Sequence, residues 1–191
     1  MDNKIFCLET EWTQSAHDLK DESQVKPLLD FLKNSNKVDY VFRQVATYFD
    51  FEYYISHLKK PSYNSYTIVY LCFHGTPGCI HFADDAPNFT ELDLLDFAED
   101  NEGIFDGKIV HFGSCRTLKM SEENIKTFKR LTKASLVTGY QRSVKMTESF
   151  IFEAWLLNTL NKHPNYRAKR LLDIAKKEMG FFADSFIFMA Y

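Results

Sequence analysis

The segment Thr67-Ile68-Val69-Tyr70-Leu71-Cys72-Phe73 is a largely apolar run that stops abruptly at His74-Gly75. A second run, residues 108–112, stops in the same way at Gly113-Ser114-Cys115. A strand that is buried on both faces of a parallel sheet reads as such a continuous apolar run. We therefore expect two buried parallel strands, each followed by a polar and chemically reactive side chain.

Strand and helix patterns alternate along the rest of the chain. Strands are expected at residues 4–8, 38–45, 67–73, 108–112, 136–140 and 185–190. Helical spacing occurs at 25–32, 51–58, after 90, from 121, at 146–160 and at 168–179. Such alternation predicts an α/β fold, a three-layer sandwich in which a mostly parallel six-stranded sheet carries helices on both faces. Residues 77–82 predict a turn and a small hairpin, and residues 9–22 and 83–89 read as polar loops.

Two helices allow more detailed expectations. Thr90 is the expected N-cap of a helix that has Asp93 in its first turn. In the helix at 146–160, four residues at helical spacing are expected to pack into the core: Phe150, Ile151, Ala154 and Trp155.

Composition narrows the class of protein. The chain has 191 residues, of which 45% are hydrophobic, and a formal net charge of −3. These values predict a single domain over residues 1–191. The sequence has no stripe of basic residues of the kind that binds nucleic acid, so we do not expect nucleic acid as a partner. No signal segment or membrane-spanning stretch is evident. We therefore expect a cytoplasmic protein without a membrane partner.

The four cysteines, Cys7, Cys72, Cys79 and Cys115, form no CxxC pair and no zinc-finger spacing with histidine. A chain of this size does not need disulfides to build a core, so free thiols are expected. No glycine-rich phosphate loop follows any expected strand. We accordingly predict neither a metal nor a cofactor.

His74 and Cys115 follow the two apolar runs directly. In open α/β sheets, ligands bind beyond the carboxyl ends of the strands, which would place an imidazole beside a thiol. This is the minimum apparatus of a nucleophilic thiol enzyme: Cys115 attacks, and His74 moves the proton. The backbone amides of Gly75 and Cys115 are the expected donors to an oxyanion.

Other residues compete for these roles. His111 lies four residues before Cys115 in the same strand, about 13 Å along it, and is expected to be a core residue instead. His81, in the expected hairpin, is a weaker candidate base. A serine mechanism on Ser114 lacks the GxSxG pattern.

Three charged residues are candidates for binding a substrate side chain. Glu9 and Glu11 follow the first strand and would receive a basic side chain, although solvated loop carboxylates are the plainer interpretation. Arg142 follows the fifth strand and would instead receive an acidic one. The two options oppose each other, so specificity stays open at this point.

An apolar strand ending in His-Gly, followed by one ending in Ser-Cys, resembles the caspase-like cysteine peptidases of clan CD, and among them the bacterial CHAT-domain peptidases most. Their pattern continues with a strand like Val137-Thr138-Gly139-Tyr140. It then has apolar positions matched here by Val144, Phe150, Trp155 and Leu160. The resemblance spans residues 65–162 and implies a caspase-like fold.

The resemblance implies a cysteine endopeptidase that hydrolyses a protein or peptide substrate through an acyl-thioester, without a cofactor. It carries the catalytic dyad onto His74 and Cys115, and the oxyanion donors onto Gly75 and Cys115. Many CHAT-type members are effectors of bacterial or antiviral defence, which implies an activating partner protein or ligand. The caspase string Gln-Ala-Cys-Arg-Gly is absent. Gly113 also stands where metacaspases carry an acidic residue.

Two other functions fit the same residues. One is a caspase-like module without catalysis that binds or regulates a partner. The other is a flavodoxin-like ligand binder, which the absence of phosphate-binding loops disfavours.

Overall fold

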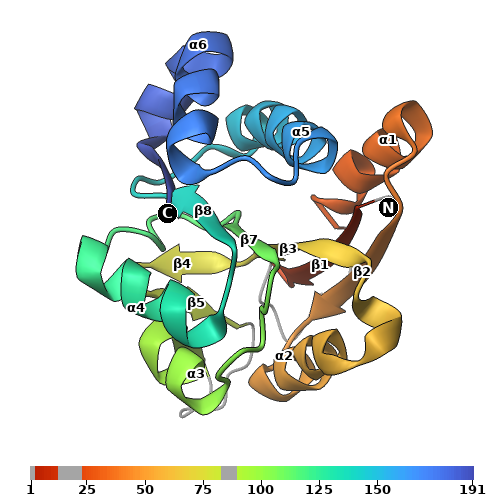
Figure 1. Cartoon of the computed structure of the whole chain (residues 1–191), viewed down its shortest axis with the longest axis vertical. Helices are drawn as coiled ribbons and strands as arrows, with labels where there is room; N and C mark the ends of the chain where they lie inside the picture. The colour runs from red at the N-terminus through yellow and green to blue at the C-terminus, as the bar shows by residue number, and fades with distance from the viewer. Residues whose placement is uncertain (1–2, 13–22, 83–89) are drawn as a thin grey trace.

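The computed structural model describes residues 3–12, 23–82 and 90–191. Within them, a six-stranded sheet has the order β2-β1-β3-β7-β8-β9 (Figure 1). Its strands are β1 (Lys4–Thr10), β2 (Tyr40–Val45), β3 (Tyr66–Cys72), β7 (Ile109–Phe112), β8 (Leu136–Tyr140) and β9 (Phe188–Ala190). All pairs are parallel except β8 with β9. The predicted α/β architecture with a mostly parallel sheet is confirmed.

Helices cover both faces of this sheet and form its two cores. One core contains residues from α2 (Tyr48–Ile55), α3 (Leu94–Asp100) and α4 (Glu122–Thr132). The other contains residues from α1 (Lys26–Asn36), α5 (Met146–Lys162) and α6 (Ala168–Phe186). Two short 3-10 helices, Ser56–Lys59 and Pro61–Tyr63, connect α2 to β3. Because alternate residues of each strand enter opposite cores, the central strands must be apolar throughout.

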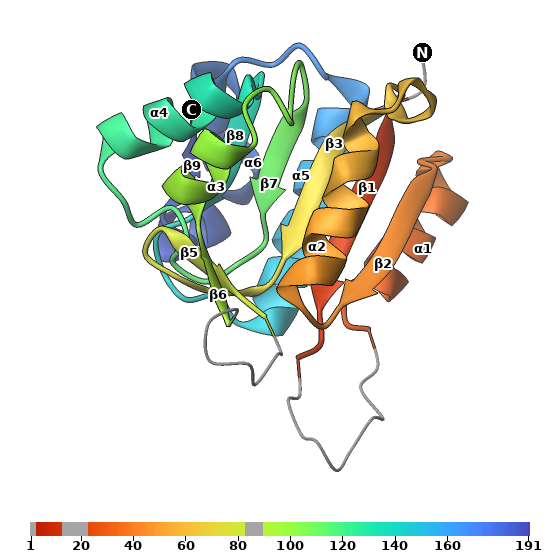
Figure 2. The same ribbon diagram turned by 90° about the horizontal axis from the view of Figure 1, so that it is seen from below.

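The two apolar runs of the sequence lie side by side. β3 pairs with β7 in parallel, from Ile68 opposite Ile109 to Leu71 opposite Phe112. Their carboxyl ends therefore meet at one edge of the sheet, where β1 also ends (Figure 2). The segments that follow these strands carry His74 and Cys115.

A second, three-stranded antiparallel sheet lies at this edge (Figure 2). It consists of β4 (His74–Thr76), β5 (Cys79–His81) and β6 (Glu91–Asp93). The predicted hairpin is therefore present, but His74 begins its first strand. A chain that leaves the large sheet enters the small one after a single residue, Phe73.

Three local expectations need correction. Asp93, rather than Thr90, caps α3, because its carboxylate accepts hydrogen bonds from the amides of Leu95 and Asp96. Helix α6 continues to Phe186, so the last strand is shorter than expected and runs antiparallel. In α5, the predicted core packing is confirmed for Phe150, Ala154 and Trp155, which are partly buried against the core, but Ile151 is exposed. The fully buried residues of this helix are Phe152, Glu153, Leu156, Leu157 and Leu160.

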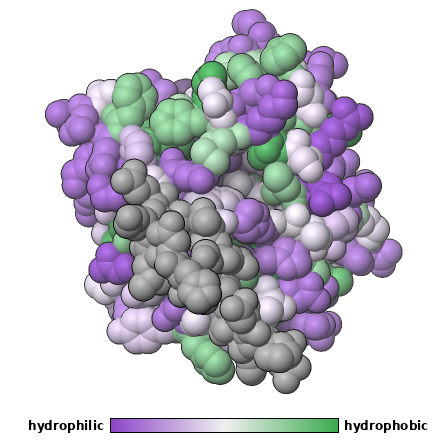
Figure 3. Space-filling model, turned by 180° about the vertical axis from the view of Figure 1, so that it is seen from behind, coloured by the Kyte–Doolittle hydropathy of each residue, from purple (hydrophilic) through white to green (hydrophobic). Residues whose placement is uncertain are grey.

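The surface mixes polar and apolar residues. On the face seen in Figure 3, apolar residues lie among polar ones mainly in the upper half. Large hydrophobic side chains that are exposed include Phe31, Phe49, Tyr53, Met146, Ile151 and Phe181. Of the helices in the described part of the chain, none combines the length and apolar character that crossing a membrane requires.

Candidate functional site

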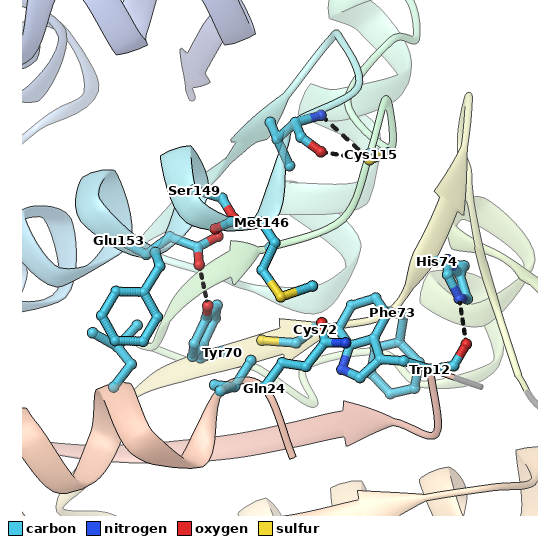
Figure 4. A pocket seen from close by; sticks show the side chains of 15 residues that line it. Trp12, Gln24, Tyr70, Cys72, Phe73, His74, Cys115, Met146, Ser149 and Glu153 are labelled. Atoms are coloured by element: carbon cyan, nitrogen blue, oxygen red, sulfur yellow. Dashed lines mark hydrogen bonds between the residues drawn. The ribbon is translucent and has the colours of Figure 1, made fainter. Parts of the chain in front are cut away.

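A pocket of about 220 Å³ opens beside the carboxyl ends of β3 and β7 (Figure 4). His74 and Cys115 both line it, as the sequence predicts. Its remaining lining is mostly apolar and comes from β3, α1, α5, the residues just before α1 and the segments that follow β1, β3, β7 and β8. These residues are Trp12, Gln24, Val25, Leu28, Tyr70, Cys72, Phe73, Gly113, Val144, Met146, Ser149, Phe150 and Glu153. The pocket thus combines a thiol, an imidazole and a hydrophobic cavity.

The imidazole of His74 is exposed, yet it is held in place by Trp12. Its Nε2 atom lies 3.3 Å from the carbonyl oxygen of Trp12, and the two rings meet edge to face with centroids 5.1 Å apart. Because a carbonyl only accepts, Nε2 carries the proton and Nδ1 of the neutral ring keeps its lone pair. This role of Trp12 could not be predicted from the sequence, since a backbone acceptor leaves no signature in residue type.

The thiol of Cys115 is half-buried and faces the loop between β8 and α5. The Val144 amide donates to Sγ at 3.4 Å, and Sγ lies 3.8 Å from the Val144 carbonyl oxygen. Within the described residues, no hydrogen bond joins the thiol to the imidazole of His74. Arg116, the next residue, has φ +59°, a left-handed conformation that is uncommon outside glycine.

The backbone of Gly75 packs directly on the cysteine loop. A Cβ atom at this position would lie 2.6 Å from the Cys115 carbonyl oxygen and 2.9 Å from the Ser114 Cβ. The buried Ser114 hydroxyl lies within 3.5 Å of the Phe73 amide and the Leu71 carbonyl. These contacts fix the cysteine loop against the end of β3, and they engage Ser114 with the β3 backbone.

The structure corrects the interpretation of Glu9. This residue lies inside β1 and is fully buried, so it is neither a solvated loop carboxylate nor free to contact a substrate. Its carboxylate accepts from the Trp12 indole at 2.7 Å and from the Gln24 and Val25 amides at 2.9 and 3.0 Å. The Ser23 hydroxyl donates to it as well. Glu9 therefore anchors the start of α1 and the residue that holds His74.

The other two substrate-binding candidates have no such internal role. Glu11 is half-buried just after β1, and Arg142 is exposed just after β8. The Arg142 carbonyl accepts from the Arg116 amide at 3.2 Å, so its backbone supports the cysteine loop. Neither side chain lines the pocket.

The competing histidines have other partners. His111 is fully buried, as expected for a core residue, and its Nδ1 lies 2.9 Å from the Thr138 hydroxyl. His81 bonds the Thr76 hydroxyl through Nε2 at 2.9 Å. Its Nδ1 lies 3.8 Å from a carboxylate oxygen of Glu91.

Glu153 is a buried acid that was not predicted as a site residue from the sequence. It comes from α5, and its carboxylate accepts hydrogen bonds from the hydroxyls of Tyr70 and, at 3.0 Å, Tyr140. His111 Nε2 lies 3.5 Å from Oε1. The acid reaches the pocket above Gly113, where a Cβ atom would lie 3.0 Å from Oε1. The sequence did contain a sign of this role, because Glu153 lies on the face of α5 that also presents Phe152 and Leu156 to the core.

Burial sets the ionisation of the groups behind the pocket. It raises the pKa of the Cys7 thiol, and it raises the pKa of Cys72 well above the usual thiol value, with neighbouring anionic groups adding to both shifts. Burial likewise holds the pKa values of Tyr70 and Tyr140 well above 10. These four groups are thus neutral near pH 7, and both phenols serve as donors to Glu153.

Comparison with known proteins gives a family without an assigned activity. No curated protein matches the sequence significantly. One family model, described as a family of unknown function (DUF6642), matches residues 2–173 and hence most of the chain. The chain therefore belongs to the DUF6642 family.

Proposed function

We propose that the protein is a caspase-like cysteine endopeptidase whose catalytic dyad is His74 and Cys115. The observation that carries the proposal is the shared pocket: an oriented imidazole and a half-buried thiol line one cavity beyond adjacent parallel strands. Ligands of open α/β sheets bind at such an edge. A base that is itself oriented by a third group is the usual arrangement of an activated nucleophile.

In the proposed reaction, each group acts on the substrate. The Cys115 sulfur attacks the scissile carbonyl carbon and gives a tetrahedral intermediate. The proton from the thiol passes through His74 to the leaving amine as the C–N bond breaks, which leaves a thioester. Water then attacks the thioester with His74 as base and releases the acid and the thiol. Since Trp12 occupies Nε2, Nδ1 is the atom that carries this proton.

Two amides are proposed to stabilise the oxyanion. Among the described residues, the Cys115 amide makes no hydrogen bond and is free to donate to a substrate. Gly75 presents its backbone beside the Cys115 carbonyl. One preorganised donor of this kind is typically worth about 3 kcal/mol of barrier.

Thiol alkylation tests the proposal. With limiting iodoacetamide at pH 7.5, mass spectrometry of tryptic peptides should find Cys115 modified fastest among the four thiols. Cys7 and Cys72 are buried, so half-buried Cys79 is the matched comparison. Alkylation of Cys79 ahead of Cys115 would argue against a nucleophilic site.

A second candidate function is a non-catalytic binding module of the same fold, regulated by or regulating a partner. The contact of the thiol with Val144, instead of with His74, favours it. An unreactive Cys115 together with retained binding of a peptide would select this alternative. The place of the protein in bacterial or antiviral defence rests on its resemblance to CHAT-type effectors and is part of the first proposal.

A further inference from the structure

The pocket beside Cys115 offers hydrogen-bond acceptors and a negative charge at its inner end. Glu153 lines it with a carboxylate whose oxygens accept from Tyr70 and Tyr140, and His111 Nε2 lies 3.5 Å from Oε1. A carboxylate has about four acceptor sites, so it can still accept from a further donor. Gln24 lines it too, and its buried Oε1 atom has no hydrogen-bond partner among the described residues. No lysine or arginine occurs in this described lining.

The walls between the thiol and Glu153 are apolar. Trp12 and Met146 contribute to them (Figure 4), and Phe150 also lines the pocket. The volume of about 220 Å³ exceeds the ~150 Å³ of a cavity that holds one benzene molecule. A side chain with a long aliphatic stem and a cationic head matches both parts, since such stems lie along apolar surface while the head seeks charge.

Gly113 lets Tyr70 and Glu153 pack directly against the backbone that leads to Cys115. It lies two residues before Cys115, and a Cβ atom there would lie 2.8 Å from the Tyr70 ring and 3.0 Å from Glu153 Oε1. A larger residue at position 113 would push Tyr70 or Glu153 out of its place beside the pocket. The missing side chain at position 113 therefore makes room for the Glu153 carboxylate at this end of the pocket.

We propose that this pocket binds the lysine or arginine side chain that precedes the scissile bond, with Glu153 pairing with its cationic head. The inference rests on the proposed peptidase function and names its substrate class. It replaces Glu9 as the acid that receives a basic side chain, because Glu9 is buried among its own partners.

Ligand binding tests the pocket without requiring catalysis. Nα-acetyl-arginine amide and Nα-acetyl-lysine amide are titrated into the protein by calorimetry, with Nα-acetyl-norleucine amide as the neutral control of similar length. If Glu153 pairs with the cationic head, at least one of the two basic ligands should bind about 10- to 100-fold more tightly than the norleucine amide. Equal affinity for norleucine, or no binding of either basic ligand, would overturn the proposal.

Two variants assign the effect to the pocket. Glu153→Gln keeps the size of the side chain and should abolish the preference for the basic ligand. Gln24→Leu, at a half-buried position, should reduce it about threefold to tenfold. If Glu153→Gln fails to fold by circular dichroism, Gln24→Leu still decides. An undiminished preference in every folded variant would contradict the assignment.

Peptidyl acyloxymethyl ketones separate this inference from the peptidase proposal. Faster modification of Cys115 by a probe with terminal lysine or arginine than by one with norleucine supports both. Equal rates would retain the reactive thiol and reject the basic specificity. Selective binding of the basic amides by a protein whose Cys115 is unreactive toward every probe would retain the pocket and reject the peptidase.

Discussion

The Nε2 atom of His74 and the carbonyl oxygen of Trp12 lie 3.3 Å apart, and the two rings pack edge to face. Removing the indole with Trp12→Ala should loosen this arrangement and lower kcat/KM for peptide cleavage about a hundredfold, since small misplacements of a catalytic group are costly. Trp12→Phe, which keeps an aromatic ring, should lose much less. Equal losses in both variants would show that ring packing on His74 does not matter.

Replacing Glu9 should reduce stability strongly, although the residue is charged. Glu9→Ala would leave the Trp12 indole and the amides of Gln24 and Val25 without their acceptor in a buried place. We expect the free energy of unfolding, from urea denaturation, to fall by about 2–4 kcal/mol. Glu11→Ala is the control and should change it by less than about 0.5 kcal/mol. Similar values for both would contradict the anchoring role of Glu9.

Gly75 should tolerate no side chain. In Gly75→Ala the new methyl group would lie 2.6 Å from the Cys115 carbonyl oxygen, which forces the cysteine loop away. We expect a loss of about 1–3 kcal/mol in unfolding free energy, accompanied by loss of peptide cleavage. Gly180→Ala, in α6 with nothing within 4 Å, should instead stabilise by up to about 1 kcal/mol. A stable and active Gly75→Ala protein would refute the close packing.

Stability should fall as the pH rises above about 9. Burial raises the pKa of Cys7 and Cys72 in the folded state, so the unfolded chain releases these protons first. The folded state then binds more protons, and each such group costs about 1.4 kcal/mol per pH unit above its unfolded pKa. Urea denaturation between pH 8 and 10.5 measures the slope, and Cys7→Ala should make it shallower. An unchanged slope would mean that Cys7 titrates alike in both states.

Much of the fold follows from local sequence patterns. The apolar runs that became β3 and β7 are long, and alternation with helical spacing restricts the topology to parallel pairing. Parallel pairing of these two strands also predicts that His74 and Cys115 lie at the same edge of the sheet, where both line the pocket. It cannot provide β6, which exists only because Glu91–Asp93 pairs with β5, nor the Asp93 cap that follows from it.

The parts of the site that escaped prediction depend on long-range contacts. Glu9 resembles the polar end of a strand, and only the arrival of residues 23–25 shows that its carboxylate is buried. Glu153 interrupts an otherwise apolar helix face, a visible signal, but its partners Tyr70 and Tyr140 come from two other strands. A backbone acceptor such as that of Trp12 cannot be inferred from residue identity.

Cleavage of a peptide library by matched variants tests the central claim most directly. The wild-type protein and Cys79→Ser should cleave the library at similar rates, whereas Cys115→Ala and His74→Ala should show no cleavage above background by mass spectrometry. Both inactive variants should retain the folded circular dichroism spectrum. Full cleavage by the Cys115→Ala protein would contradict the assignment of Cys115 as the nucleophile.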